Sequence, residues 1–211
     1  MKLPRRQFLR LAAGAAALPV VSSIANAQTY PTRPVRIIVP FAAGGGVDIT
    51  ARLVGQWLSE RLGQPFVVEN RPGAGGNIGT EAVARSKPDG HTLLVTASTF
   101  VTNRPLFRNL PYDPAKDFTP LALSAWGTLL FAAHPATPYA TVKELIATAK
   151  AQPGKLNYAS PGVGTPHHLA MELFKSAAGV DIVHVPYKGT AGAVTDLLGG
   201  QVGLMSLPIH V

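Results

Sequence analysis

The sequence predicts an α/β fold of two lobes, each built on a mostly parallel sheet. Short runs of β-branched residues alternate with segments in which apolar residues recur at helical spacing. This alternation lapses over residues 103–117, where Pro105, Pro111 and Pro114 interrupt it, and then resumes. Three glycine-rich turns each follow a predicted strand and precede a predicted helix. Such alternation favours parallel strands with helices on both faces of the sheet.

The first lobe is predicted to have a βαβαβ order. We expect strands at residues 35–39, 66–69 and 92–95 from their β-branched and apolar composition, and a short helix at 78–85. A longer helix follows the first strand. Its apolar positions have helical spacing: Val47, Ala51, Val54, Leu58 and Leu62.

The second lobe repeats this pattern, with strands expected at residues 129–133, 157–159 and 182–185. Thr141 and Glu144 have the spacing of a capping box, and Thr165 before Pro166 is typical of a helix start. Three helices are marked by apolar positions, which should face the core in the first two: Val142, Leu145, Ile146 and Ala149; Leu169, Leu173, Phe174 and Ala177; Ala193, Val194, Leu197 and Leu198.

The N-terminal residues have the pattern of an export signal. Arg5-Arg6-Gln7-Phe8-Leu9 is typical of a twin-arginine signal and precedes an uncharged apolar run at residues 11–21. Ala25-Asn26-Ala27 supplies small residues at the spacing that signal peptidase recognises. The run is about half of the ~20 residues that a membrane-spanning helix needs, which disfavours a membrane anchor. We expect cleavage after Ala27 and a periplasmic product.

The C-terminal residues favour an unfinished domain. Residues 200–205 have the pattern of a strand entering a core, and the sequence stops on an apolar run shortly afterwards. We therefore expect residues beyond 211 to complete the first lobe. The predicted organisation is a signal peptide at 1–27, an incomplete first lobe at 28–105, a second lobe at 106–200 and the start of a return crossing to the first lobe at 201–211.

Charge and cysteine content exclude several classes of protein. Residues 1–27 hold four basic residues and no acidic one, so their removal would lower the formal net charge from +8 to +4. A mildly basic protein without a Lys/Arg stripe interleaved with aromatic residues is not expected to bind nucleic acid, although it suits anionic solutes. The chain has no cysteine, which excludes disulfides and a lipid-modified cysteine. We expect a monomer without cofactor or metal.

The glycine-rich turns are the candidate binding elements. They span residues 41–46, 71–77 and 160–165, and ligands of open α/β sheets bind beyond the carboxyl ends of the strands. Glycines let the backbone approach a ligand closely, and free N–H groups at a helix start attract anions. With the hydroxyls of Ser160 and Thr165, turns from both lobes could hold a carboxylate. The alternatives are a flexible strand-to-helix turn at 41–46 and helix capping alone at 160–165.

Enzymatic functions fit these residues less well. A dinucleotide-binding fingerprint requires a third glycine where the chain has Ile49. A serine hydrolase requires glycine two residues before its nucleophile, but Tyr158 occupies that position relative to Ser160. His168 and Glu172 share a helix face, yet two ligands do not make a metal site. We expect no catalytic residue.

Five longer motifs occur in order between residues 30 and 205. They are Val39-Pro40-Phe41 continued by Gly44-Gly45-Gly46-Val47-Asp48, Val68-Glu69-Asn70-Arg71-Pro72-Gly73-Ala74-Gly75-Gly76-Asn77-Ile78-Gly79, Pro88-Asp89-Gly90-His91-Thr92-Leu93-Leu94, Leu156-Asn157-Tyr158-Ala159-Ser160, and Val185-Pro186-Tyr187-Lys188-Gly189. Together they resemble the substrate-binding receptors of tripartite tricarboxylate transporters. The resemblance implies a periplasmic-binding-protein fold of type II, a "Venus flytrap" whose lobes close on a small organic anion and present it to membrane permease subunits.

The resemblance also implies where the ligand binds. In the family, turns and ordered waters hold the carboxylate, which maps onto the first and third glycine-rich turns. The candidate ligand-binding residues are Phe41, Ala42, Ala43, Gly44, Gly45, Gly46, Asp48, Asn77, Ser98, Ser160, Gly164, Thr165 and Tyr187. A carboxylate at Asp48 would also stabilise the helix that it begins, through the helix dipole. Arg71 could neutralise an anion, although pairing with a surface carboxylate is the simpler expectation.

A periplasmic sensor that docks on a signalling kinase remains an alternative to a transport receptor. Both would close on a ligand through the same surfaces, so the sequence does not separate them.

Overall fold

The computed structural model describes residues 30–208, and the predicted export signal at residues 1–27 lies outside this range. From Arg33 onward the described chain is one compact unit that contains two sheets. Within the described residues, no helix combines the length and the apolar character needed to cross a membrane.

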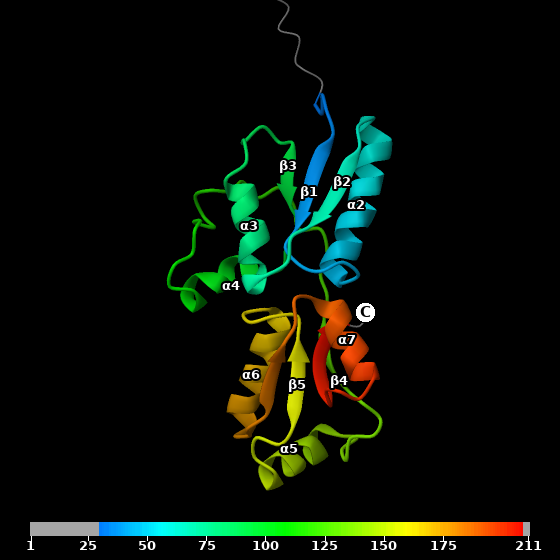
Figure 1. Cartoon of the computed structure of the whole chain (residues 1–211), viewed down its shortest axis with the longest axis vertical. Coiled ribbons are helices and arrows are strands. Elements are labelled where there is room, and N and C mark those ends of the chain that lie inside the picture. Colours follow the sequence, from blue (N-terminus) through cyan, green and yellow to red (C-terminus); the bar gives the residue numbers. More distant parts are fainter. Residues whose placement is uncertain (1–29, 209–211) are drawn as a thin grey trace, which may run out of the picture. The chain divides into compact units, whose positions relative to one another are not determined.

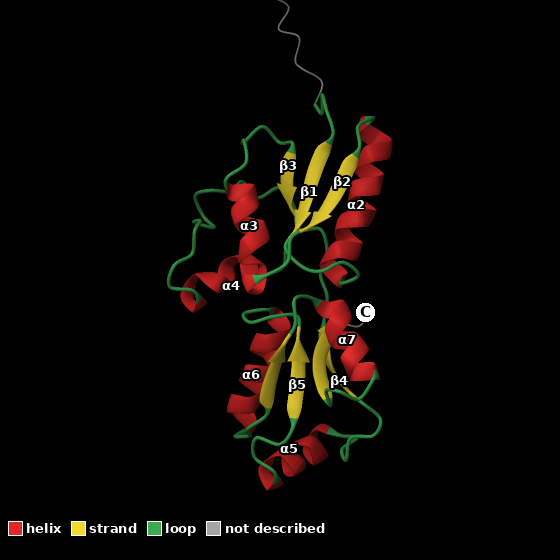
Figure 2. Cartoon of the chain, in the orientation of Figure 1, coloured by secondary structure: helices red, strands yellow, loops and turns green. Residues whose placement is uncertain are grey.

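The first sheet has three parallel strands in the order β2-β1-β3 (Figures 1 and 2). Its strands are β1 (Val35–Val39), β2 (Phe66–Asn70) and β3 (Thr92–Leu94). Its helices are α2 (Gly46–Leu62), α3 (Asn77–Ala84) and α4 (Thr99–Leu106), with a short 3-10 turn, η2 (Ala74–Gly76), before α3. The central strand β1 is almost wholly buried, and it packs with Ala51 of α2 and Phe66 of β2. The predicted βαβαβ order is confirmed.

The second sheet has four strands in the order β4-β7-β5-β6. The strands are β4 (Leu129–Ala133), β5 (Asn157–Ser160), β6 (Val183–Pro186) and β7 (Leu204–Pro208), and the helices are α5 (Val142–Ala151), α6 (Pro166–Ala178) and α7 (Thr190–Leu198). Strands β5, β6 and β7 are parallel, whereas β4 runs antiparallel to β7. The predicted capping box at Thr141 and Glu144 is present, and Thr165 caps α6 before Pro166.

Strand β7 changes the predicted boundary of the second lobe. Residues 201–211 were expected to begin a return crossing, but residues 204–208 pair with both β4 and β5 and are buried throughout. The apolar run that follows Gly203 therefore completes the second sheet from inside, between two strands that precede it in the sequence. A central strand buried on both faces needs this apolar composition.

Several predicted helix details are wrong. Residues 103–117 were expected to be loop, but α4 extends to Leu106 and includes Pro105. Among the positions expected to face the core, Val142 and Leu173 are 52% and 71% exposed, and Ala177 is also exposed. In α6, Met171 is fully buried in place of Leu173. The cause is rotation of each helix about its axis, which is set by packing against the sheet and not by the apolar periodicity alone.

Candidate functional site

The three glycine-rich turns meet around one small cavity. Its volume is about 90 Å³, and it is lined by Pro40, Phe41, Gly73, Ala74, Gly75, Gly76, Pro161, Tyr187 and Lys188. These residues come from the carboxyl ends of β1, β2, β5 and β6, so both sheets contribute. The expected convergence of turns from the two sheets is therefore present in the structure.

The first turn, residues 41–46, is held in place by Asp48 at the start of α2. The Asp48 side chain is 3% exposed, and its carboxylate accepts hydrogen bonds from Gly44 N at 2.9 Å, Arg52 Nε at 3.0 Å and Asn70 Nδ2 at 2.8 Å. Burial raises the pKa of Asp48, but the hydrogen bonds from Arg52, Gly44 and Asn70 outweigh it and leave the pKa below its usual 3.8. The carboxylate is thus engaged within the protein and fixes the turn.

The same turn contacts the segment that begins α7. Ala42 N donates to Lys188 O at 3.1 Å, and a β-carbon at Gly189 would lie 2.8 Å from Ala42 Cβ. A β-carbon at Gly45 would lie 3.2 Å from Thr190 Oγ1. The sequence did not predict Lys188 O and Gly189 as part of the site. The motif Tyr187-Lys188-Gly189 follows a predicted strand, and this position indicated that the two residues lie at the same edge of the sheet as the other turns.

The second turn, residues 71–77, is anchored by buried amides. Asn77 Oδ1 accepts from Asn103 Nδ2 at 2.7 Å and from Tyr112 Oη at 2.8 Å, while Asn103 Nδ2 also donates to Gly75 O at 3.0 Å. Arg71 Nε donates to Glu69 Oε1 at 2.6 Å, which is the surface pairing that was the simpler expectation. Asn103 was not predicted, because it lies in the helix that the sequence pattern missed.

The third turn, residues 160–165, is closed by its own hydroxyls. Thr165 Oγ1 donates to Gly162 O at 2.7 Å, and Ser160 Oγ accepts from Gly162 N at 3.2 Å. Ser160 and Thr165 are 0% and 2% exposed. Thr102 Oγ1, from α4, donates to Gly164 O at 3.2 Å and so ties this turn to the helix that follows the first sheet.

The remaining candidates are spread around these turns. Tyr187 lines the small cavity, and its hydroxyl donates to Asp196 Oδ2 at 2.5 Å, which raises the pKa of Tyr187 to about 12. Ser98 is exposed and immediately precedes α4. Ala43 and Gly44 are exposed, whereas Gly45 is buried. Across residues 30–208, no group of three or more His, Cys, Asp or Glu side chains could hold a metal ion.

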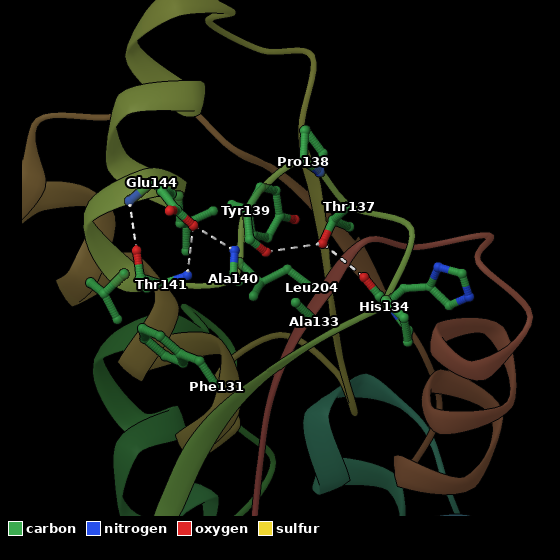
Figure 3. A pocket seen from close by; sticks show the side chains of 13 residues that line it. Phe131, Ala133, His134, Thr137, Pro138, Tyr139, Ala140, Thr141, Glu144 and Leu204 are labelled. Carbon is green, nitrogen blue, oxygen red and sulfur yellow. Dashed lines mark hydrogen bonds between the residues drawn. The ribbon is translucent and has the colours of Figure 1, made fainter.

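A second, larger cavity of about 590 Å³ lies beside the end of β4 and the start of α5 (Figure 3). Several of its polar side chains already have partners. Glu144 accepts from the N–H groups of Ala140 and Thr141, and Thr137 Oγ1 donates to His134 O at 2.8 Å. None of the glycine-rich turns lines this cavity. The smaller cavity is therefore the better candidate for solute recognition.

Comparisons with known proteins identify the family. The family described as "Tripartite tricarboxylate transporter family receptor" matches residues 50–210. Protein BugT of Bordetella pertussis is 41% identical over 184 residues, which are 86% of this chain and 56% of BugT. The chain thus spans somewhat more than half the length of this curated relative.

Solved structures share the fold. Rpa4515 of R. palustris, determined with adipate, has a TM-score of 0.82 and 41% identity, over 85% of this chain and 60% of its own. MatC (Rpa3494) from Rhodopseudomonas palustris, determined with bound malate, has a TM-score of 0.79 and 36% identity, over 85% of this chain and 62% of its own. The fold of the described chain is that of these α/β binding proteins.

Proposed function

Because the chain belongs to the tripartite tricarboxylate transporter receptor family, whose members are periplasmic solute-binding proteins and not enzymes, we propose that it captures a small organic carboxylate and delivers it to a membrane permease. The solute is held where the turns at residues 41–46, 71–77 and 160–165 converge. The permease takes over the bound solute in unchanged chemical form, so the receptor itself performs no chemistry.

The convergence of the three turns is the observation that carries this proposal. Backbone N–H groups of glycine-rich turns and of helix starts suit a carboxylate, because they offer donors and partial positive charge without a bulky side chain. The structure relatives with adipate and malate support a dicarboxylate or hydroxydicarboxylate ligand. Neither turn 41–46 nor turn 160–165 carries a basic side chain. Since Gly44 N, Gly162 N and Gly164 N already donate within the protein, the donors to a solute are the remaining amides of these turns.

Isothermal titration of the purified protein with adipate and with malate tests the proposal. We expect saturable one-to-one binding of at least one of the two, and at least about tenfold weaker binding of the neutral analogue hexane-1,6-diol, a difference of about 1.4 kcal/mol. Equal binding of the diol would argue against carboxylate recognition. Mass-spectrometric detection of a converted product would reject the receptor class.

The export route gives a separate prediction. With a twin-arginine signal and cleavage after Ala27, the exported protein begins at Gln28 and is recovered in the periplasmic fraction. Replacing Arg5 and Arg6 together by lysine should retain the precursor in the cytoplasm, because that pathway requires the paired guanidinium groups. N-terminal sequencing and fractionation measure the outcome. Unchanged export of the double lysine variant would indicate the general secretory pathway, and Met1 on periplasmic protein would contradict cleavage.

A further inference from the structure

The imidazole rings of His168 and His184 contact the turn at residues 160–165. Gly164 N donates to His168 Nδ1 at 3.3 Å, and His184 Nε2 lies 2.6 Å from Ser160 Oγ in hydrogen-bond contact. The two rings themselves are packed together, with centroids 4.3 Å apart and an angle of 32° between their planes. One residue comes from α6 and the other from β6, so the pair joins the turn to both neighbouring elements.

The surroundings of this pair contain three further ionisable groups that face it. The Tyr158 ring stacks on His184 with centroids 4.8 Å apart. The Tyr158 hydroxyl donates to Glu172 Oε1 at 2.6 Å, and Lys175 Nζ donates to the same oxygen at 2.8 Å. Glu172 therefore already has a cationic partner and a hydroxyl donor, and it makes no hydrogen bond to either imidazole.

This environment favours the neutral form of both rings. Burial lowers the pKa of His184 to about 4, helped by the neighbouring His168 and by Lys175 against the opposing effect of Glu172. Burial likewise lowers the pKa of His168, with Glu172 opposing and Lys175 adding to the shift. The adjacent His167 has no hydrogen-bond partner at either ring nitrogen, and burial lowers its pKa to about 4 as well.

Protonation of the pair conflicts with the geometry of the turn. Nδ1 of His168 can accept from Gly164 N only while it carries no proton, because two N–H donors would otherwise face each other. Two imidazolium rings packed this closely would also repel. When the turn moves away from the two rings, their pKa values can return toward the ordinary histidine value of about 6.5. As the pH falls below that value, the moved state takes up protons first and gains population.

We propose that His168 and His184 are positioning residues that keep the turn at 160–165 in its binding conformation while neutral, and that their protonation in mildly acidic medium weakens solute binding. This regulation rests on the proposed function, because it acts through the same turn. The pair does not contact the solute; it acts through Ser160 and Gly164.

Variants that keep the hydrogen bonds but cannot titrate provide the test. Asparagine at position 168 places an acceptor near the position of Nδ1, and glutamine at position 184 places a polar group near that of Nε2. Adipate affinity of the wild-type protein should fall about tenfold between pH 7.5 and pH 5.0 relative to that of the His168→Asn/His184→Gln double variant. The ratio removes the titration of adipate itself, which is common to both proteins. His167→Asn is the matched control and should keep the pH dependence of the wild type.

A readout without solute separates this inference from the proposed function. In ¹⁵N-detected imidazole spectra, His184 should be neutral at pH 6, the pKa of His168 should lie below its ordinary value, and the Gly164 amide signal should shift in step with the protonation of His168. The same pH dependence of adipate affinity in the wild type and the double variant, or loss of that dependence in His167→Asn alone, would overturn the proposal. So would ordinary titration of His168 near pH 6.5 without a response at Gly164. Absence of adipate binding with the expected spectra would count against adipate as the solute and leave the positioning role supported by the spectra.

Discussion

Replacing Gly164 by alanine is expected to lower the affinity for adipate by at least about tenfold, or about 1.4 kcal/mol. Gly164 has φ +80°, a conformation that costs a residue with a β-carbon about 1–2 kcal/mol. The new β-carbon would also lie 2.6 Å from Asn103 Oδ1 and 3.0 Å from Leu106 Cδ1. Because Asn103 also donates to Gly75 O and Asn77 Oδ1, its displacement would also disturb the turn at residues 71–77. Calorimetric titration measures the loss.

Gly179→Ala is the matched control for this substitution. Gly164 lies just before α6, and Gly179 lies just after it with φ +62°, but a β-carbon at Gly179 meets nothing within 4 Å. We expect Gly179→Ala to lower the free energy of unfolding by about 1 kcal/mol without changing the affinity for adipate.

Gly45 has φ −87°, so Gly45→Val tests the contact with Thr190 alone and should lower the affinity for adipate less than Gly164→Val does. Equal affinities of the alanine variants at 164 and 179 would show that turn 160–165 does not shape the site.

Asp48→Ala is expected to lower the free energy of unfolding by about 2–4 kcal/mol and to abolish measurable adipate binding. The substitution removes the acceptor of Gly44 N and of Arg52 Nε, and one of the two acceptors of Asn70 Nδ2, which also donates to Phe41 O. Hydrogen bonds to a charged group contribute about 1.5–3 kcal/mol each. Since the bond from Gly44 N to the Asp48 carboxylate fixes the turn at 41–46, its loss destabilises the conformation of the turn that we propose binds the solute. Chemical denaturation and calorimetric titration measure the two effects.

The exposed pair of Glu81 and Arg85 is the control for Asp48 and Arg52. Both pairs have i,i+4 spacing on a helix, but Glu81 and Arg85 are 31% and 73% exposed and their carboxylate holds no turn. Glu81→Ala should cost at most about 0.5 kcal/mol. A loss of similar size in both variants would contradict the anchoring role of Asp48.

The pH dependence of the Asp48 contribution has a definite sign. Its pKa is lowered on folding, so the folded state binds fewer protons than the unfolded state near the usual value of 3.8. The stability difference between wild type and Asp48→Ala should therefore be constant above about pH 5 and shrink as the pH falls through the lowered pKa. Denaturation curves at pH 7, 4 and 3 would show this trend. A difference that grows toward low pH would contradict it.

The turns could be predicted from the sequence because their determinants are local. Runs such as Val35–Val39 and Phe66–Glu69 alternate with helical periodicity, and glycines follow each run at the point where a parallel strand must turn. The capping box at Thr141 and Glu144 depends on residues three apart, and it formed as predicted. The assignment of individual side chains to a solute remains a prediction.

The partners of those turns could not be predicted, because they are distant in the sequence. Asn103 reaches Gly75 and Asn77 from a helix whose Pro105 masks its pattern. Lys188 O meets Ala42 N across about 146 residues of chain, a separation over which no local pattern specifies a contact. Asn70 holds Asp48 only because β2 lies next to β1 in the sheet.

By itself, the sequence determined the strands and all the helices except α4, the points where the chain turns on glycine, and the family to which it belongs. These depend on the spacing of apolar residues and on backbone freedom within a few positions. Only the tertiary structure decided that β7 lies between β4 and β5, which face of α6 is buried, and that Asp48 and His168 accept hydrogen bonds from the glycine-rich turns. Those outcomes depend on packing and hydrogen bonding between distant segments, where the cost of an unpaired buried group selects one arrangement among several that local patterns allow.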